Sequence, residues 1–283
     1  MENSRSVTLE TTKTPDHQAA TSSNSRLALS LRRLLIHARW TLARKLRQQP
    51  SVFMPLLGHW GRTARGDFRG FARDTEVVVD AYPRSANTFA TYAFLYAQSR
   101  PVRVCHHHHA PACLIAAAKR NLPALTIVRE PFAAIRSFAI YRWAGHPHLV
   151  TPRECVSCAI KDYVAFYQPL LPIRNRLFVA RFTSVTSDYG DVLRAFYDRY
   201  DAKFETFEHT PENVAQVYRM CDAYFLNSQQ SLDQLNPLQA ARPRSGIQDT
   251  IDEFNQVMRE FADTVMWRNT LRLFDDLDGK ANI

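Results

Sequence analysis

The stretch EVVVDAYPRSANTFATYAFL, from Glu76 to Leu95, changes its pattern in the middle. It begins with a β-branched run, Val77 to Val79, which is typical of a strand buried on both faces. From Thr88 onward, apolar residues recur at helical spacing. The turn between the two patterns carries an arginine, two hydroxyls and an amide within residues 84–88. The stretch therefore predicts a strand, a polar turn and a helix in immediate succession.

Strand and helix patterns alternate along most of the chain. Strand-like runs occupy residues 76–82, 102–105, 124–129 and 177–182. Helical patterns occupy residues 88–98, 111–121, 131–143, 153–171, 187–200, 211–233 and 249–276. This alternation predicts an α/β fold with a mostly parallel central sheet flanked by helices.

The turn after the first strand is expected to bind an anion. In open α/β sheets, ligands bind beyond the carboxyl ends of the strands, and the free N–H groups at a helix start attract negative charge. Ser85 and Thr88 add hydroxyl donors, and Arg84 adds a permanent positive charge. The alternative is a helix start whose side chains only satisfy the backbone. The ATP-binding pattern G-x-x-x-x-G-K-S/T is missing here, since no glycine lies between Gly70 and Gly145.

A second strand end repeats this arrangement. The segment TIVREPFAAIRSFAIYR ends a strand at Arg129 and starts a helix at Pro131, with Ser137 on the second turn of that helix. An arginine at a strand end and a hydroxyl on the adjacent helix can bind one further phosphate. The two segments together predict a ligand with two separate phosphate-type groups.

Through these two segments, the sequence resembles the sulfotransferases that use 3′-phosphoadenosine 5′-phosphosulfate (PAPS). The family's 5′-phosphosulfate loop, Tyr-Pro-Lys/Arg-Ser-Gly-Thr/Asn-Thr-aromatic, reads here Tyr82-Pro83-Arg84-Ser85-Ala86-Asn87-Thr88-Phe89. Its 3′-phosphate motif matches Arg129-Glu130-Pro131 and Ser137. The resemblance spans residues 77–247 and implies a P-loop-like sulfotransferase fold. Ala86 stands where the family has glycine, so the loop is expected to need a conformation that accommodates a Cβ atom.

The resemblance implies a role for each matched residue. The 5′-phosphosulfate would be bound by Arg84, Ser85, Ala86, Asn87, Thr88 and Phe89, and Arg84 would also stabilise charge on the transferred group. Arg129 and Ser137 would bind the 3′-phosphate. A late segment, ARPRSGI, offers Arg242, Arg244 and Gly246 as a match to the loop that closes over this phosphate in many members. PAPS is therefore expected as co-substrate, with sulfuryl transfer to a hydroxyl or amine of an unidentified acceptor.

Four consecutive histidines follow the second strand. The family has a catalytic histidine shortly before a proline at this place, and VCHHHHAP supplies His106 to His109 before Pro111. Histidine is suited to take the proton of the acceptor, since its pKa lies near neutrality. Position relative to Pro111 favours His109 as the catalytic base, and on an extended segment His107 shares its face. A metal site and a role without chemistry are the alternatives for the cluster. The mechanism needs no metal, and none is predicted.

Five cysteines are too few and too odd in number for a disulfide framework. Cys155 and Cys158 form a Cys-x-x-Cys pair, but no second pair completes a zinc site. A structural or incidental role is therefore predicted for these cysteines.

Positive charge is concentrated in one segment. The formal net charge is +9, and seven basic residues and no acid lie between Arg26 and Gln48. Residues 26–48 are predicted to form a basic amphipathic helix, either docked on the domain or lying on an anionic membrane surface. The rest of the chain is only mildly basic, so no nucleic-acid partner is expected. Residues 1–25 are expected to be a disordered tail, and residues 49–283 the sulfotransferase-like α/β domain.

Neither a secretory signal nor a membrane span is apparent in the sequence, because arginines interrupt every apolar run of residues 26–48. A cytoplasmic location is predicted, with peripheral contact to the inner membrane face through this helix. Two rival functions remain open at this point. One is a P-loop-like nucleotide kinase or hydrolase, and the other is a non-catalytic protein that binds anionic lipid through residues 26–48.

Overall fold

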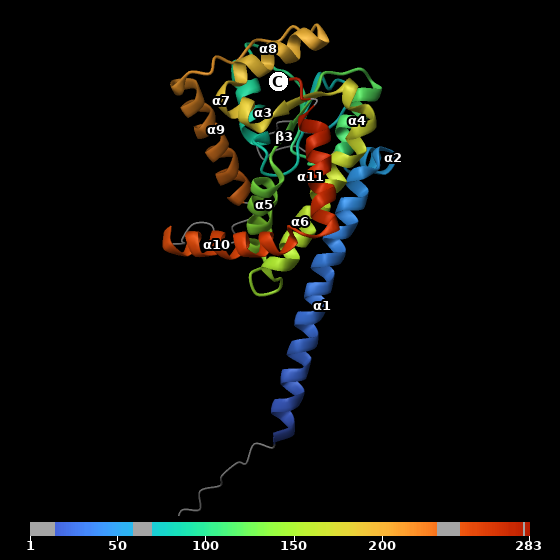
Figure 1. The fold of residues 1–283 in the computed structure, drawn as a ribbon, viewed down its shortest axis with the longest axis vertical. Helices are drawn as coiled ribbons and strands as arrows, with labels where there is room; N and C mark the ends of the chain where they lie inside the picture. The colour runs from blue at the N-terminus through green and yellow to red at the C-terminus, as the bar shows by residue number, and fades with distance from the viewer. Residues whose placement is uncertain (1–14, 59–69, 231–243, 280) are drawn as a thin grey trace, which may run out of the picture. The chain divides into compact units, whose positions relative to one another are not determined.

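The computed structural model describes residues 15–58, 70–230, 244–279 and 281–283 (Figure 1). The chain divides into two units, residues 1–40 and 41–283, and the division falls inside the first helix, α1 (Pro15–Gln48). The expected boundary lies at the end of that helix. Residues 41–48 therefore belong to the larger unit, where Arg44 and Gln48 hydrogen-bond to residues of the α/β domain.

The helix α1 begins at Pro15, whereas the sequence predicts a helix only from residue 26. Proline is well suited to the first helical position, because its missing N–H has no intrahelical partner there. In the smaller unit, Leu29, Leu31, Leu34 and Leu35 are all at least half exposed. Among the described residues, no helix combines the length and the apolar character needed to cross a bilayer. Contact of residues 26–48 with a membrane surface stays a prediction.

The larger unit contains a four-stranded, all-parallel sheet with strand order β2-β1-β3-β4. The four predicted strands are confirmed. Their bounds are β1 (Val77–Val79), β2 (Val104–His106), β3 (Ala124–Val128) and β4 (Phe178–Arg181). In register, Val78 of β1 lies opposite Cys105 on one side and Ala124 on the other. The predicted α/β fold with a parallel sheet flanked by helices is confirmed at this level.

The helices lie close to their predicted positions. Those of the larger unit are α2 (Pro50–Phe53), α3 (Asn87–Ala97), α4 (Pro111–Lys119), α5 (Pro131–Gly145), α6 (Pro152–Tyr167), α7 (Phe182–Ser187), α8 (Tyr189–Tyr200), α9 (Pro211–Gln230), α10 (Arg244–Phe261) and α11 (Val265–Asp278). A π-helical turn, η1 (Met54–Gly58), follows α2, and a 3₁₀ segment, η2 (Gln168–Arg176), follows α6.

The single helix expected over residues 249–276 is two helices, α10 and α11. Thr264 caps the second of them, since its hydroxyl accepts a hydrogen bond from the Trp267 N–H at 3.1 Å. An N-cap residue has extended backbone angles and therefore interrupts the helix before it. The apolar spacing continues across this break, which explains why the pattern reads as one helix.

Helices cover both faces of the sheet. On one face, Val77 and Val79 of β1 share a hydrophobic cluster with Phe94 of α3 and Phe196 of α8. On the other face, α4 and α11 pack against β3. In Figure 1, α3 and α7 lie to one side of β3 and α4 and α11 to the other. Burial of both faces requires the continuous apolar strands that the sequence shows.

The strand order decides where a ligand can bind. The chain leaves β1 toward β2 on one side, and later returns to place β3 on its other side. In open parallel sheets, the crevice at such a switch in strand order, outside the carboxyl ends of the strands, is the usual ligand site. The loops after β2, β1 and β3 lie side by side at this edge, and they carry the three polar segments that the sequence analysis identified.

Candidate functional site

The loop after β1 has an unusual backbone. Arg84 and Ala86 adopt left-handed conformations with φ of 67° and 61°. Ala86 is the N-cap of α3 and provides no side-chain cap for it. When left-handed and other residues alternate in this way, successive backbone N–H groups point into a common hollow of the loop. Such a hollow can bind an anion. Ala86 thus accommodates its Cβ atom at a positive φ, at a cost of about 1–2 kcal/mol relative to glycine.

The two predicted phosphate-binding segments meet at the carboxyl ends of β1 and β3. Arg129 Nη1 donates a hydrogen bond to the Arg84 carbonyl oxygen at 2.5 Å. Arg84 Nε in turn donates to Ser137 Oγ at 3.0 Å. Arg84, Arg129 and Ser137 therefore belong to one site, although they come from separate stretches of sequence.

This site carries an excess of positive charge. The Arg129 guanidinium lies over the Phe182 ring, 4.2 Å from its centroid. Burial lowers the pKa of Arg129, and the positive charges of Arg84 and Arg136 lower it further. Like charges this close repel one another unless an anion lies between them. The arrangement favours a negatively charged ligand.

Glu130, which follows Arg129 in the sequence, forms hydrogen bonds away from this cluster. Its carboxylate accepts hydrogen bonds from the N–H groups of Phe132 and Ala133 at 2.7 and 2.8 Å, and it caps α5. Free N–H groups at the N-terminus of α5 are therefore already bonded to the Glu130 carboxylate. An anion at this strand end would be bound by Arg129 and Ser137, and the helix N–H groups would contribute little.

Three tyrosines support the two loops from below. Tyr82 OH donates to the Ala159 carbonyl at 3.0 Å, and the hydroxyls of Tyr163 and Tyr167 donate to carbonyls at the end of β3. The Tyr163 bond, at 2.9 Å, reaches the carbonyl of Arg129 itself. All three side chains are fully buried. They fix the backbone from which the site arginines project.

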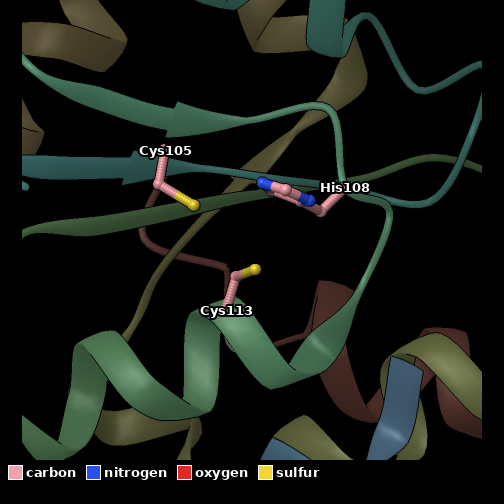
Figure 2. Close-up of side chains that lie close together, drawn as sticks. All are labelled: Cys105, His108 and Cys113. Atoms are coloured by element: carbon pink, nitrogen blue, oxygen red, sulfur yellow. The ribbon is translucent and has the colours of Figure 1, made fainter. Parts of the chain in front are cut away.

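The histidine segment after β2 is not extended. His107 and His109 have φ of 59° and 49°. The argument from alternating faces is therefore wrong for this segment, because each left-handed residue turns the chain. His108 turns toward Cys105 and Cys113, and the ligand atoms of these three side chains all lie within 4.8 Å of one another (Figure 2). Among the described residues, this group could hold a metal ion.

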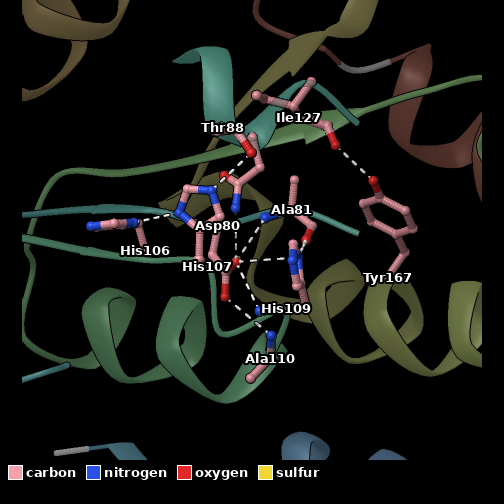
Figure 3. A network of polar contacts seen from close by, with 10 residues as sticks. Asp80, Ala81, Thr88, His106, His107, His109, Ala110, Ile127 and Tyr167 are labelled. Atoms are coloured by element: carbon pink, nitrogen blue, oxygen red, sulfur yellow. Dashed lines mark hydrogen bonds and ion pairs between the residues drawn. The ribbon is translucent and has the colours of Figure 1, made fainter. Parts of the chain in front are cut away.

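His107 and His109 turn toward the loop after β1 (Figure 3). His107 Nε2 lies 3.0 Å from Thr88 Oγ1, and its other ring nitrogen contacts His106. His109 Nδ1 lies 2.8 Å from the Ala81 carbonyl oxygen. A carbonyl can only accept, so this nitrogen of His109 carries the proton and Nε2 keeps its lone pair. His109 is thus oriented as a proton acceptor, whereas both ring nitrogens of His107 have partners.

Asp80 was not predicted as a site residue. Its side chain connects the end of β1 to the histidine segment (Figure 3). It is fully buried, and its carboxylate accepts hydrogen bonds from the N–H groups of Ala81, His109 and Ala110 at 3.0 to 3.1 Å. Burial raises the pKa of Asp80, and electrostatic interaction with His109 and His108 lowers it in part. Asp80 positions the end of β1 against the histidine segment. The signal in the sequence is an acid inside the apolar run VVVDAY.

A small pocket opens beside His109. Its lining includes Tyr82, Pro83 and His109, together with Arg44 and Arg47 from the end of α1. The cavity volume is about 20 Å³, enough for one ordered water. Burial lowers the pKa of Arg47. Within the described part of the chain, the Arg47 guanidinium has no hydrogen-bond or ion-pair partner, because the neighbouring Asp162 pairs with Arg44 and Arg142 at 2.5 and 2.6 Å.

Several predicted site residues lie outside this arrangement. Arg242 is outside the described residues, and Arg244 and Gly246 start α10 with side chains that are not described. Phe89 is buried in the hydrophobic core cluster, where its ring packs near Tyr189. Contacts of these four residues with a nucleotide stay predictions.

The Cys-x-x-Cys pair fits the predicted structural role. Cys155 and Cys158 are buried free thiols on α6. Burial raises the pKa of Cys155 to about 12. Cys158 Sγ accepts a hydrogen bond from Arg44 at 3.3 Å. A thiol with such a raised pKa is a poor nucleophile.

No model of a known protein family matches this chain, and no curated protein matches it with significant similarity.

Proposed function

We propose that the protein is a PAPS-dependent sulfotransferase of P-loop-like fold. The observation that carries this proposal is the contact of Arg129 with the carbonyl of Arg84, 45 residues away in the sequence. It brings two cationic strand ends together at the switch point of the sheet, where a ligand with two anionic groups can bind both. PAPS is such a ligand, since it carries a 5′-phosphosulfate and a separate 3′-phosphate.

Each end of PAPS would have its own set of donors. The N–H groups at the start of α3, with the hydroxyls of Ser85 and Thr88, would bind the 5′-phosphate. Arg129 and Ser137 would bind the 3′-phosphate. In the described structure these two residues bond to the carbonyl and the side chain of Arg84, and phosphate oxygens would give stronger, charge-assisted bonds in their place.

The transfer step needs positioning, charge stabilisation and one proton acceptor. The acceptor oxygen forms a bond to sulfur while the bond from sulfur to the 5′-phosphate oxygen breaks. The leaving group, 3′,5′-ADP, keeps that electron pair, and the Arg84 guanidinium stabilises the negative charge. The acceptor's proton passes to His109 Nε2, whose lone pair is available because Nδ1 donates to Ala81.

The acceptor would approach His109 at the mouth of the pocket beside it, which has room for only a small part of the acceptor. Arg47 lines this pocket and has no hydrogen-bond or ion-pair partner among the described residues. The neighbouring Asp162 carboxylate is already shared by two other arginines. A half-buried cation with no partner of opposite charge costs free energy, and an anionic ligand group would offset that cost. We therefore expect the preferred acceptor to carry a carboxylate, sulfate or phosphate near the hydroxyl that is modified.

Replacing Arg47 by glutamine should raise KM for such an anionic acceptor roughly 10- to 100-fold, the usual worth of a hydrogen bond to a charged group. The value of kcat and the affinity for 3′,5′-ADP should stay unchanged. The measurement is sulfuryl transfer from labelled PAPS to acceptors found by screening sugars, lipids, phenols and peptides. Lys45→Gln, on the exposed side of the same helix, is the matched control. An equal loss with neutral acceptors would contradict this role of Arg47.

Nucleotide preference tests the proposed function itself. In thermal unfolding, 3′,5′-ADP should stabilise the protein more than AMP, which lacks the 3′-phosphate, and more than ATP with magnesium. A ligand at 100 times its Kd adds about 2.7 kcal/mol, so the shifts are readily measured. Arg129→Ala should abolish the preference for 3′,5′-ADP over AMP. Greater stabilisation by ATP with magnesium would instead support a nucleotide kinase or hydrolase and overturn the proposal.

A further inference from the structure

Two buried thiols and one imidazole converge beside the histidine segment (Figure 2). Cys105 comes from β2, His108 from the loop that follows, and Cys113 from the first turn of α4. Both cysteines are fully buried and neither forms a disulfide. Their sulfur atoms and a ring nitrogen of His108 all lie within 4.8 Å of one another.

The chemistry of this donor set selects the metal. Thiolate sulfur and imidazole nitrogen are the preferred ligands of Zn²⁺, which binds them in tetrahedral geometry at about 2.0–2.3 Å. Magnesium and calcium require oxygen ligands, and none of these three side chains has one. In sequence the set reads Cys-x-x-His-x-x-x-x-Cys, a compact spacing that brings the ligands together through one strand end and one helix start.

The surroundings favour a neutral complex. When both thiols lose their protons to solvent, two thiolates balance the charge of one Zn²⁺, so that no net charge is buried. The His108 ring packs edge-on against Phe53, with ring centroids 5.8 Å apart, and this contact restricts its orientation. His108 is only half-buried, so a water molecule could supply a fourth ligand.

We propose that Cys105, His108 and Cys113 bind one Zn²⁺ ion per chain. This proposal departs from the absence of a metal site expected from the sequence, and it does not depend on the proposed sulfotransferase activity. The ion would join the end of β2 to α4 across the histidine segment, and so fix the loop that carries His109. It takes no part in the transfer step.

The test uses the full-length protein purified without a polyhistidine tag. Elemental analysis after dialysis should find one zinc per chain, and replacement by Co²⁺ should give the intense near-ultraviolet absorption of cobalt–thiolate bonds. Cys105→Ser and Cys113→Ser should each abolish both signals. Cys221→Ser, which changes a buried cysteine on α9, should retain them and is the matched control.

Since replacement of a buried cysteine can prevent folding, two further measurements keep the test decisive. His108→Gln changes a half-buried residue and should weaken zinc binding at least 10-fold while circular dichroism stays native. In the native wild-type protein, X-ray absorption at the zinc edge should show zinc–sulfur distances of about 2.3 Å, which only thiolate ligands give. Absence of the cobalt–thiolate band in the reduced wild-type protein, or a disulfide between Cys105 and Cys113 in freshly isolated protein, would overturn the proposal.

Discussion

Replacing Arg84 by alanine should reduce the rate of sulfuryl transfer by about 10³-fold, with little change in stability. An arginine that stabilises developing charge on a transferred group is worth roughly 10²- to 10⁵-fold in rate. In the described structure the Arg84 side chain bonds only to Ser137, at the exposed edge of the sheet, so its removal leaves no buried group unpaired. The loss should therefore appear in kcat, measured by release of 3′,5′-ADP from PAPS, and not in the melting temperature.

Two matched variants separate this role from a general effect of charge. Arg84→Lys keeps the positive charge at a position where lysine occurs in the family that the sequence resembles, and it should retain activity within roughly 10-fold of the wild type. Arg194→Ala removes an exposed arginine that pairs only with Asp191 on the same helix, and it should have no effect. Equal activity of the alanine and lysine variants would show that Arg84 does not stabilise the transferred group.

The fold is largely predictable from the sequence because burial on both faces leaves a strong local signal. Each strand, such as Val77–Val79, reads as a short apolar run between polar turns, and all four were found. Strand order, in contrast, depends on packing between distant segments and has no local signal. In the observed order, β3 lies next to β1 on the side away from β2 and the histidine segment. This order makes Arg84, after β1, and Arg129, after β3, neighbours.

The site is predictable only as far as local motifs reach. Arg84, Arg129 and Ser137 could be found because each follows a strand end at a fixed spacing. Asp80 is visible in the sequence only as an acid inside an apolar run, and its role could not be predicted because it comes from hydrogen bonds to a segment nearly 30 residues away. The histidine faces were predicted from an extended backbone. Histidine is more frequent than most residues at positive φ, but residue type does not show which members of a run of four histidines adopt it, here His107 and His109.

The second large effect is expected at His109. His109→Ala should lower kcat by about 10² to 10⁴-fold, the usual contribution of a general base, while the Kd for 3′,5′-ADP stays unchanged. The reason is geometric: Nδ1 is held by the Ala81 carbonyl at 2.8 Å, and the ring lines the pocket with Nε2 as its remaining acceptor. Calorimetric titration with 3′,5′-ADP and turnover of labelled PAPS measure the two quantities separately.

His107→Ala is the informative comparison, because His107 lies two residues away in the same segment. Both of its ring nitrogens contact the protein, one of them Thr88 of the nucleotide loop at 3.0 Å. Its removal should therefore disturb the loop and weaken binding of 3′,5′-ADP, with a smaller loss in kcat than His109→Ala at saturating PAPS. If His107→Ala abolished turnover with nucleotide affinity intact, and His109→Ala did not, the proton acceptor would be His107. The hydrogen bond from His109 to Ala81 would then serve only to fold the loop.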